Sequence, residues 1–499
     1  MTKAWRFKID LKSVLLCCGA IYIIIYILTA FFRMVYPYEL EAMEGGMVDH
    51  VLQILAGEKL YVPPSLNFVP YAYPPFYYYL AAAFSKLLGV GFFPLRLISF
   101  CASLGIMALI YLFVCRETRD RSWGIAAVSI FAATYKLSDA WFDLARLDSL
   151  FLLLILLFAY LVRFHPSRIP AVSAAAVLLL AVLTKQSALM IALPLMVYAV
   201  FFEKRSWPWL LGTSTVLIGG GIWILNAIHH GWYMYYIFDL TGQRWLEKLI
   251  RQRIIGFWTD DMLKPLAVAV FLLLGFLISE FAAENKKRFF FYFAFAGGMI
   301  GTAWFSRLEY GAYGNALLSA HALLAIGFGL AMARFWQGTS AQESGKKPVQ
   351  NIFLFALGLI QFVVLAYNPF LLVPDAADRK AGDHLIRTIS RLPGDVMVPG
   401  HGFLSYLTGK PRYAQEVAVK NLTRIDQGPV KEKLEKEIAA AIESKRFTAL
   451  ILDKHDWLRP ILKRNYEFSR IIFSDPKLFW PVTGKKLRPN FIYIPIKSK

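Results

Sequence analysis

Cysteine and charged side chains are both scarce in this sequence of 499 residues. It holds four cysteines, and charged residues make up 18% of the chain. All four cysteines lie in apolar stretches, so the sequence indicates neither a disulfide framework nor a cysteine-rich metal site. The chain also lacks a Walker motif, a GxGxxG before a helix and a GxSxG turn. The common motifs for nucleotide binding and serine-hydrolase chemistry are therefore absent.

Apolar side chains, in contrast, are abundant. Hydrophobic residues make up 57% of the chain, aromatic residues 16%, and the mean hydropathy is +0.49. A helix that crosses a bilayer needs about 20 apolar residues, so this content is enough for about eleven spans. The composition excludes a soluble enzyme, a disordered protein and a fibre. The net charge of +20 follows from the positive-inside rule in such a protein, so no nucleic-acid partner is expected.

We predict an all-α polytopic membrane domain with about eleven transmembrane helices. The first apolar run, 14–32, is too long for a signal peptide, and no cleavage site follows it. Basic residues cluster in alternate connections, which places these connections and the N-terminus in the cytoplasm and, with an odd number of spans, the C-terminus outside. The localisation predicted is therefore the cell inner membrane. The other spans are expected near residues 94–115, 122–136, 148–163, 170–184, 188–202, 208–228, 265–283, 289–304, 315–334 and 350–368.

The segment 75–90 is apolar but only marginally long enough to span a membrane. If it crossed, every later basic connection would change sides. Tyr77, Tyr78, Tyr79 and Lys86 suit an amphipathic helix at the membrane surface. We therefore predict an interfacial helix in the first outer loop.

The composition changes near Asn368, where short apolar runs begin to alternate with charged helices. We predict a transmembrane domain over 1–368 and a small extracytoplasmic α/β domain over 369–499. A helix is expected over 430–445. Strands are expected over 396–399, 449–453, 470–474 and 490–496.

Charged residues at the predicted outer ends of the spans are candidates for function, because charges at membrane depth are costly. The first group is Glu39, Glu41, Glu44 and Asp49, just after the first span. Acidic residues suit the start of a helix, expected over 40–56, so these residues are either helix caps or include a general base in a water-poor pocket.

The second group is Asp143, Arg146 and Asp148. Asp148 opens a span, so helix capping is again one interpretation, and the other is that it points into the outer cavity. Asp143 and Arg146 are spaced to form an ion pair with each other. Lys185, between two later spans, either extends to the membrane surface or contacts a lipid-linked phosphate.

A further group surrounds Gly311 and Gly314, which break a helix at its membrane end. Interrupted backbone at such a place often lines a cavity, and the group consists of Arg307, Glu309, Tyr310 and Asn315. A basic stripe formed by Arg244, Lys248, Arg251 and Arg253 is spaced for an interfacial helix and contacts either lipid head groups or the donor phosphate.

The histidines give weak signals for a metal. His229 and His230 lack a third ligand at helical spacing, and His401 is interpreted as a structural residue. No metal ligands are therefore predicted, and the need for a divalent metal ion as cofactor stays open.

The order and spacing of several short motifs resemble the GT-C superfamily of integral-membrane glycosyltransferases, in particular the protein O-mannosyltransferase and lipid A aminoarabinose transferase families. The resemblance covers most of residues 10–335. After the acidic stretch 39–49, the motifs are ILAGEKLY (54–61), YPPFYYYLAAAFSKLLG (73–89), PLRLISF (94–100), LARLDSLF (144–151) and LTKQS (183–187).

The resemblance implies a polyprenyl-phosphate sugar donor and an acidic catalytic residue in the first outer loop. It places that residue between Glu41 and Glu44. Asp148 matches the family's second functional aspartate, and Lys185 matches the lysine of its Thr-Lys-Gly motif, in which Gln186 here replaces glycine. A lysine that related enzymes have before a proline is Tyr73 in this chain, so basic residues elsewhere are expected to hold the phosphate.

We predict inverting transfer of a sugar from this donor to a lipid, glycan or protein acceptor on the outer face of the membrane; the alternative is a non-catalytic transporter of lipid-linked or small solutes. The predicted catalytic residues are Glu41, Glu44 and Asp148. The predicted donor-phosphate ligands are Lys185, Arg307, Arg244 and Arg146. The predicted substrate cavity is lined by Glu39, Asp49, Asp143, Tyr71, Tyr73, Glu309, Tyr310 and Asn315.

Overall fold

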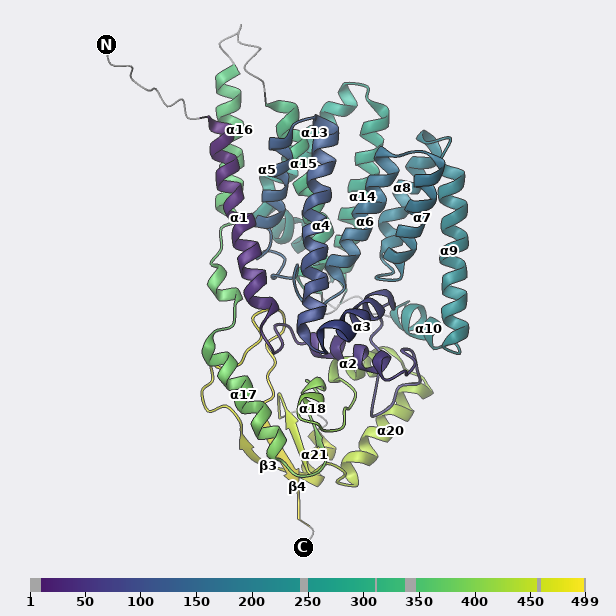
Figure 1. Ribbon diagram of the computed structural model, residues 1–499, viewed down its shortest axis with the longest axis vertical. Helices are drawn as coiled ribbons and strands as arrows, with labels where there is room; N and C mark the ends of the chain where they lie inside the picture. Colours follow the sequence, from purple (N-terminus) through teal and green to yellow (C-terminus); the bar gives the residue numbers. More distant parts are fainter. Residues whose placement is uncertain (1–9, 243–249, 310–311, 337–346, 456–458, 498–499) are drawn as a thin grey trace, which may run out of the picture.

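The protein consists of a bundle of long helices with a smaller mixed helix-and-sheet region at one end. The computed structural model describes residues 10–242, 250–309, 312–336, 347–455 and 459–497. Figure 1 shows the helical bundle above and the sheet below, with interfacial helices between them. Arg244, Lys248 and Tyr310 lie outside the described residues.

Each of the eleven predicted spans is a helix. Six stretches of the described chain are long and apolar enough to cross a membrane: α1, α4, α9, 253–282, α14 and 314–335; α16 with the bent stretch after it makes a seventh. The predicted number of eleven spans stays a prediction, since the remaining helices are shorter. The helices are α1 (Leu11–Met34), α4 (Phe92–Thr118), α5 (Arg121–Ala133), α6 (Asp148–Phe164), α7 (Arg168–Val182), α8 (Ala188–Phe202), α9 (Trp207–Ile228), α13 (Lys264–Ala282), α14 (Lys286–Leu308), α15 (Leu318–Phe335) and α16 (Lys347–Val364).

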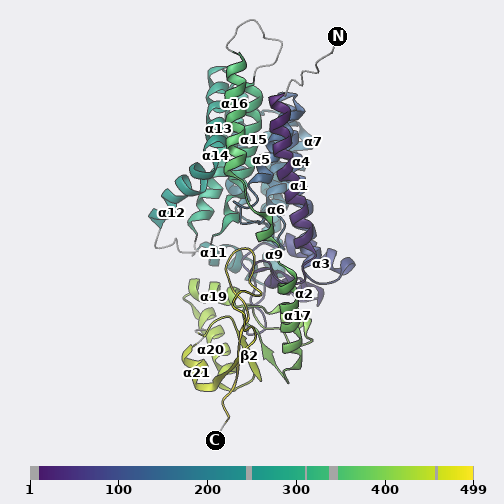
Figure 2. The same cartoon turned by 90° about the vertical axis from the view of Figure 1, so that its left-hand side faces the viewer.

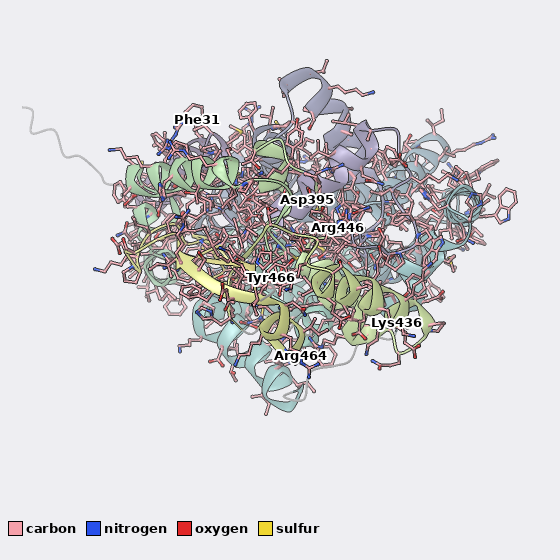
Figure 3. The ribbon with its side chains drawn as sticks, turned by 90° about the horizontal axis from the view of Figure 1, so that it is seen from below. Phe31, Asp395, Lys436, Arg446, Arg464 and Tyr466 are labelled. Atoms are coloured by element: carbon pink, nitrogen blue, oxygen red, sulfur yellow. The ribbon has the colours of Figure 1, made fainter. Side chains whose placement is uncertain are left out.

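Position within the bundle differs sharply between helices. In α1, one face carries exposed apolar side chains such as Ile24 and Phe31, each 56% exposed, and Phe31 lies at the edge of the molecule seen from below (Figure 3). Apolar side chains exposed in this way suit contact with lipid. The stretch 314–335 is instead 94% buried, so α15 forms the centre of the bundle.

Two helices of the loop between α1 and α4, which is predicted to be the first outer loop, lie at the lower end of the bundle. They are α2 (Glu44–Leu55) and α3 (Phe76–Leu88). Helix α3 lies across this end and does not run along the bundle (Figure 1); its predicted position at a membrane surface stays a prediction. Helix α2 begins later than the predicted residue 40, so residues 39–43 form a turn. Short helical segments of the second long loop follow: α10 (Trp232–Met234), η1 (Tyr235–Asp239), α11 (Leu240–Gly242), α12 (Ile250–Gly256) and η2 (Phe257–Leu263).

The region after α16 contains a four-stranded sheet in the order β1-β2-β4-β3. Strands β1 and β2 are parallel, with Val396 opposite Ala449, and the other pairs are antiparallel. The strands are β1 (Val396–Met397), β2 (Ala449–Leu452), β3 (Tyr466–Ile471) and β4 (Phe491–Pro495). Strand β3 begins four residues before the predicted 470, so that prediction was shifted along the chain.

Helices cover this sheet. Viewed from below, α20 and α21 lie in front of the bundle, with Lys436 and Arg464 near their outer surfaces (Figure 3). Helix α20 agrees closely with the helix predicted over 430–445. The helices are α17 (Ala376–Arg391), α18 (Phe403–Leu407), α19 (Glu416–Ile425), α20 (Pro429–Glu443) and α21 (Arg459–Asn465).

The region after α16 packs directly on the first outer loop. The backbone N–H of Thr483 donates to the carbonyl of Leu40 (3.0 Å), and that of Ala414 donates to the carbonyl of Leu66 (2.9 Å). The side view shows the helices and strands of this region below the interfacial helices (Figure 2). Residues of the region after α16 therefore contact the acidic stretch and the loop that follows it.

Candidate active site

Glu44 is the first residue of α2, and both of its carboxylate oxygens are hydrogen-bonded within the protein. Its two carboxylate oxygens accept hydrogen bonds from Arg96 Nε (2.9 Å) and Arg96 Nη2 (2.6 Å), and both side chains are fully buried. The backbone N–H groups of Leu40 and Ala145 donate to the same carboxylate, each at 2.7 Å. Burial raises the pKa of Glu44, but Arg96 and these N–H groups outweigh burial and lower it. Glu44 is therefore a charged, satisfied anchor that joins α2, α4 and the 140–147 turn.

Glu41 is held more loosely. Its carboxylate lies 3.3 Å from Arg146 Nη1 and accepts from the backbone N–H of Met43 (3.0 Å), and it is 2% exposed. Burial raises the pKa of Glu41 to about 7, although Arg146 opposes that shift. A buried carboxylate whose pKa lies near neutrality is suited to accept a proton at physiological pH.

Asp148 does not cap its own helix. No side-chain capping bond is made at the start of α6; the carboxylate instead accepts from Lys185 Nζ (2.9 Å), Asn315 Nδ2 (3.2 Å) and Trp141 Nε1 (2.9 Å). Three separate elements therefore converge on Asp148. The side chain of Lys185 is 19% exposed, so the ammonium group keeps some access from outside.

A second arginine connects the two acidic residues. Arg146 donates from Nη2 to the hydroxyl of Tyr73 (3.1 Å), and its guanidinium lies 5.5 Å from the centres of the Tyr73 and Trp141 rings. Since Trp141 donates to Asp148, contacts run without a break from Glu41 through Arg146 and Trp141 to Asp148. Residues 41 and 148 thus share one site despite their distance in the sequence.

The predicted pair of Asp143 with Arg146 was wrong. Asp143 pairs with Arg33 Nε (2.8 Å) and accepts from the hydroxyl of Tyr135 (2.7 Å), and both charged side chains are fully buried. The turn at 134–147 points the two side chains in different directions, because it is not a helix and does not have i, i+3 geometry. Asp143 therefore holds the end of α1 and does not line the cavity.

Glu39 forms a buried cluster with the region after α16. Its carboxylate is hydrogen-bonded to His401 Nδ1, and His401 Nε2 lies 3.2 Å from Asp453 Oδ1. Burial lowers the pKa of His401, but the two carboxylates outweigh burial and raise it well above its usual value. His401, expected to be structural, therefore joins the first outer loop to this region as a charged group, and Glu39 is occupied by it.

Asp49 and Tyr71 lie on the other side of α2. Both oxygens of Asp49 are buried without a hydrogen-bond partner among the described residues, and so is the hydroxyl of Tyr71. Burial raises the pKa of Asp49 to about 8, with Arg412 opposing the shift. Asp49 lines a cavity with residues 58–69 and 412–415; its predicted place in a substrate cavity stays a prediction.

Of the last predicted group, Asn315 reaches the site and Arg307 does not. Arg307 pairs with Asp261 (Nε to Oδ2, 2.8 Å) and donates to the carbonyl of Ala312 (2.8 Å). The backbone carbonyl of Glu309 accepts from Arg253 Nη1 (2.7 Å). Arg307 is thus engaged in a local ion pair. Arg244 and Tyr310 lie outside the described residues.

A small cavity adjoins Asp148 and Lys185. It is also lined by Ser187, Thr302 and Asn315. The hydroxyl oxygens of Ser187 and Thr302 are buried without a partner among the described residues. These hydroxyls add hydrogen-bonding groups next to the Lys185 ammonium.

No group of three or more histidine, cysteine or carboxylate side chains with metal-binding geometry occurs among the described residues. The carboxylates of the site are bound to arginine, lysine and N–H groups instead.

Sequence reasoning gave no role to Arg96, Trp141 or Asp453. Arg96 had the clearest signal, because an arginine within the apolar run 94–100 needs a buried acidic partner. Trp141 and Asp453 had no distinguishing pattern, since their roles depend on contacts between segments far apart in the chain.

Comparison with known proteins supports this fold. Residues 72–232 match the family model described as dolichyl-phosphate-mannose-protein mannosyltransferase. None of the curated protein sequences matches the chain. The structure is similar to ArnT from Cupriavidus metallidurans bound to undecaprenyl phosphate, with a TM-score of 0.58, 12% identity, and coverage of 97% of this chain and 98% of that chain.

The apo state of the same ArnT gives a TM-score of 0.58 at 11% identity, with the same coverage. An oligosaccharyltransferase from Archaeoglobus fulgidus covers 95% of this chain and 76% of its own at 12% identity, but its TM-score of 0.47 is too low to support an argument. At such identities a structural likeness establishes the fold alone. Residues 72–232 thus resemble a mannosyltransferase family, and the chain as a whole shares its fold with ArnT.

Proposed function

We propose that this protein transfers a sugar from a polyprenyl-phosphate-linked donor to an acceptor hydroxyl on the outer face of a membrane, with inversion at the anomeric carbon. The observation that carries the proposal is the continuous set of contacts from Glu41 through Arg146 and Trp141 to Asp148 and Lys185. It combines a carboxylate of raised pKa with a cationic group at one end of the bundle.

In this mechanism the acceptor oxygen attacks the anomeric carbon while the bond from that carbon to the phosphate oxygen breaks. Glu41 accepts the proton of the acceptor hydroxyl, and the polyprenyl phosphate leaves with its negative charge. Lys185 stabilises this charge, since a preorganised cation in a water-poor site acts most strongly where charge develops. A single displacement of this kind inverts the configuration at the anomeric carbon.

Glu41 is a better candidate for the base than Glu44. All four bonds of Glu44 run to buried structural groups, and its pKa is lowered, so it has little tendency to take up a proton. Asp148 serves to position Lys185 through their 2.9 Å contact. Arg146 orients Glu41 and Tyr73.

The donor class is also supported by ArnT, a protein of similar fold that was solved bound to undecaprenyl phosphate. The lipid tail would lie along the apolar helices, so that the sugar-phosphate reaches the site almost as if by an intramolecular step. We further propose a bacterial inner-membrane location with the region 369–499 as a separate extracytoplasmic domain.

The test is to incubate the purified protein with a panel of polyprenyl-phosphate sugars and with lipid, glycan or peptide acceptors. We expect glycosylated acceptor and free polyprenyl phosphate in equal amounts, with inverted configuration of the new bond by NMR. Vesicle uptake of the lipid-linked sugar without any chemical change would contradict the proposal and favour a transporter. A reporter fused after the last residue should be active only outside the cytoplasm.

A further inference from the structure

A larger cavity lies on the side of α2 opposite Glu44. Its volume is ≈ 550 Å³, and it is enclosed by the end of α2, the loop 58–69 and residues 412–415. This volume falls within the roughly 300–1,000 Å³ of small-molecule sites. The cavity therefore lies where the first outer loop meets the region after α16.

The cavity contains a carboxyl group without a structural role of its own. Asp49 is 5% exposed and lines the cavity, and neither of its oxygens has a hydrogen-bond partner in the described part of the chain. Arg412 donates to the backbone carbonyl of Asp49 (3.1 Å), and no bond from it to the carboxylate is present among the described residues. Buried polar groups are nearly always hydrogen-bonded, so an unpaired one points to a ligand that completes it.

The other lining side chains suit a neutral, hydroxyl-rich ligand. Half of them carry uncharged amide, hydroxyl or aromatic groups: Gln53, Ser65, Asn67, Phe68, Tyr413 and Gln415. The two charged members, Glu58 and Arg412, have opposite signs. Amide groups both donate and accept, as paired sugar hydroxyls do. Because burial raises the pKa of Asp49 to about 8, this carboxyl group holds a proton at neutral pH and can also donate and accept. Aromatic rings provide apolar faces for the C–H groups of a sugar ring.

The cavity adjoins the proposed reaction centre along two routes. Gln415 Nε2 donates to the carbonyl of Ala42 (3.3 Å), the residue after Glu41. On the second route, the ring of His50 stacks on Tyr71 with centres 4.7 Å apart, and Tyr71 meets the edge of Tyr73. Tyr73 is bonded to Arg146. The cavity is thus connected to the Glu41–Arg146 pair through Gln415 on one route and through His50, Tyr71 and Tyr73 on the other.

We propose that this cavity binds a neutral sugar unit of the acceptor, with Asp49 as its central hydrogen-bonding group. The inference rests on the proposed function and adds the chemical class of the acceptor to it. The bound sugar unit would hold the acceptor so that a hydroxyl group reaches Glu41. The acceptor is accordingly a glycan or glycolipid, and a bare peptide would leave the Asp49 carboxyl unpaired.

Direct binding tests the site without requiring transfer. Methyl α-mannoside, methyl β-glucoside and methyl N-acetylglucosaminide are each added to the detergent-purified protein, and binding is measured by saturation-transfer NMR. Cyclohexylmethanol, which has a similar ring but one hydroxyl, serves as the comparison ligand. We expect at least one glycoside to bind, and cyclohexylmethanol to bind at least about tenfold more weakly, the factor that corresponds to one or two hydrogen bonds.

Three variants make the test specific. Asp49→Leu should weaken glycoside binding about tenfold or more, whereas Asp49→Asn, which still donates and accepts, should stay within about threefold of wild type. Asp120→Asn, at the opposite end of the bundle beside Lys12, should bind as wild type does. Thermal unfolding of Asp49→Leu checks the fold, and we expect no loss of stability because the carboxyl group it removes has no partner.

The outcomes separate this inference from the proposed function. If no glycoside binds to wild type at tens of millimolar, or if Asp49→Leu binds equally well, the sugar site is wrong whatever the transfer assay gives. If glycosides bind and depend on Asp49 but no donor is consumed, the site stands and the proposed transfer fails. If transfer occurs with a peptide acceptor and is unchanged in Asp49→Leu, the transferase stands and the site fails.

Discussion

Glu41 and Glu44 lie three residues apart, yet their surroundings are opposite. Glu44 makes four hydrogen bonds, two to Arg96 and two to backbone N–H groups, and its pKa is lowered. Glu41 has one ion pair, with Arg146 at 3.3 Å, and one backbone hydrogen bond, and burial raises its pKa to about 7. Both side chains are almost completely buried, so burial alone does not explain the difference.

The comparison shows that the number of hydrogen bonds decides which buried carboxylate stays ionised. Desolvation acts on both residues and favours the protonated form, and only a bidentate arginine with N–H donors outweighs it. A buried carboxylate that has such donors, as Glu44 does, stays ionised and acts as a structural anchor. A residue left partly unsatisfied can exchange a proton, which a general base must do.

The largest effect is expected for Glu41→Gln. This change removes the proton acceptor but keeps the size of the side chain, and we expect kcat/KM to fall by about 10²–10⁴-fold. The midpoint of thermal unfolding should change little, because Glu41 carries a partly protonated carboxyl group near pH 7. Transfer rates and unfolding are measured on the same preparation. A near-wild-type rate would remove Glu41 from the mechanism.

The pH profile of wild type sharpens this result. The base must be deprotonated to act, so log kcat/KM should rise with pH up to about 7, the pKa of Glu41, and level off above it. A profile that is flat from pH 5 to 8 would contradict a base with a raised pKa. In Glu41→Gln, this rise of log kcat/KM with pH should be absent.

Glu44→Gln should have the opposite effect to Glu41→Gln: a large loss of stability with a small loss of rate. It leaves the Arg96 guanidinium buried without its counter-charge, and loss of one member of a buried pair destabilises a protein by about 3–5 kcal/mol. We expect a clear fall in the unfolding midpoint, while the fraction that stays folded turns over at a rate within about tenfold of wild type. A stable protein without activity would instead make Glu44 the catalytic residue and invert the comparison.

Lys185→Ala should act mainly on the donor. The contact with a phosphate contributes up to a few kcal/mol, so we expect the donor KM to rise about tenfold or more. The change also leaves the buried Asp148 carboxylate without its ammonium partner, so the unfolding midpoint should fall as well. Lys287→Ala is the matched control, because Lys287 also pairs with a buried carboxylate, Glu203, but near the other end of the bundle. Equal donor KM values for the two variants would reduce Lys185 to a structural role.

The last prediction concerns the pH dependence of stability and not the rate of transfer. Asp49 has a pKa of about 8 in the folded protein against 3.8 for the unreacted side chain, so the folded state keeps a proton that the unfolded state releases. Stability from this residue is therefore present at low pH and is lost as pH rises from about 4 to about 8. Relative to wild type, Asp49→Asn should gain about 3–4 kcal/mol between pH 5 and pH 8. Denaturant unfolding at both pH values measures this, and a constant difference would contradict the raised pKa.

Much of the fold followed from local pattern. Long apolar runs predicted each of the helices of the bundle. The distribution of basic residues predicted that 75–90 does not cross the membrane, and α3 lies across the lower end of the bundle. Asp148 and Lys185 were identified from two separate short motifs and lie 2.9 Å apart. Pairing partners were harder to predict: Asp143 was expected beside Arg146 but binds Arg33, because the turn between them is irregular and their choice of partner is made across the fold.

Composition and motif order by themselves indicated a helical membrane protein in which an acidic stretch follows the first span. These features depend on residues near one another in the sequence, which hydropathy and spacing record directly. Only the tertiary structure decided which of two neighbouring glutamates is left incompletely bonded, and that His401 and Asp453 meet Glu39. Such outcomes depend on desolvation and on hydrogen-bond partners that come from segments far apart in the chain. No local sequence pattern contains that information.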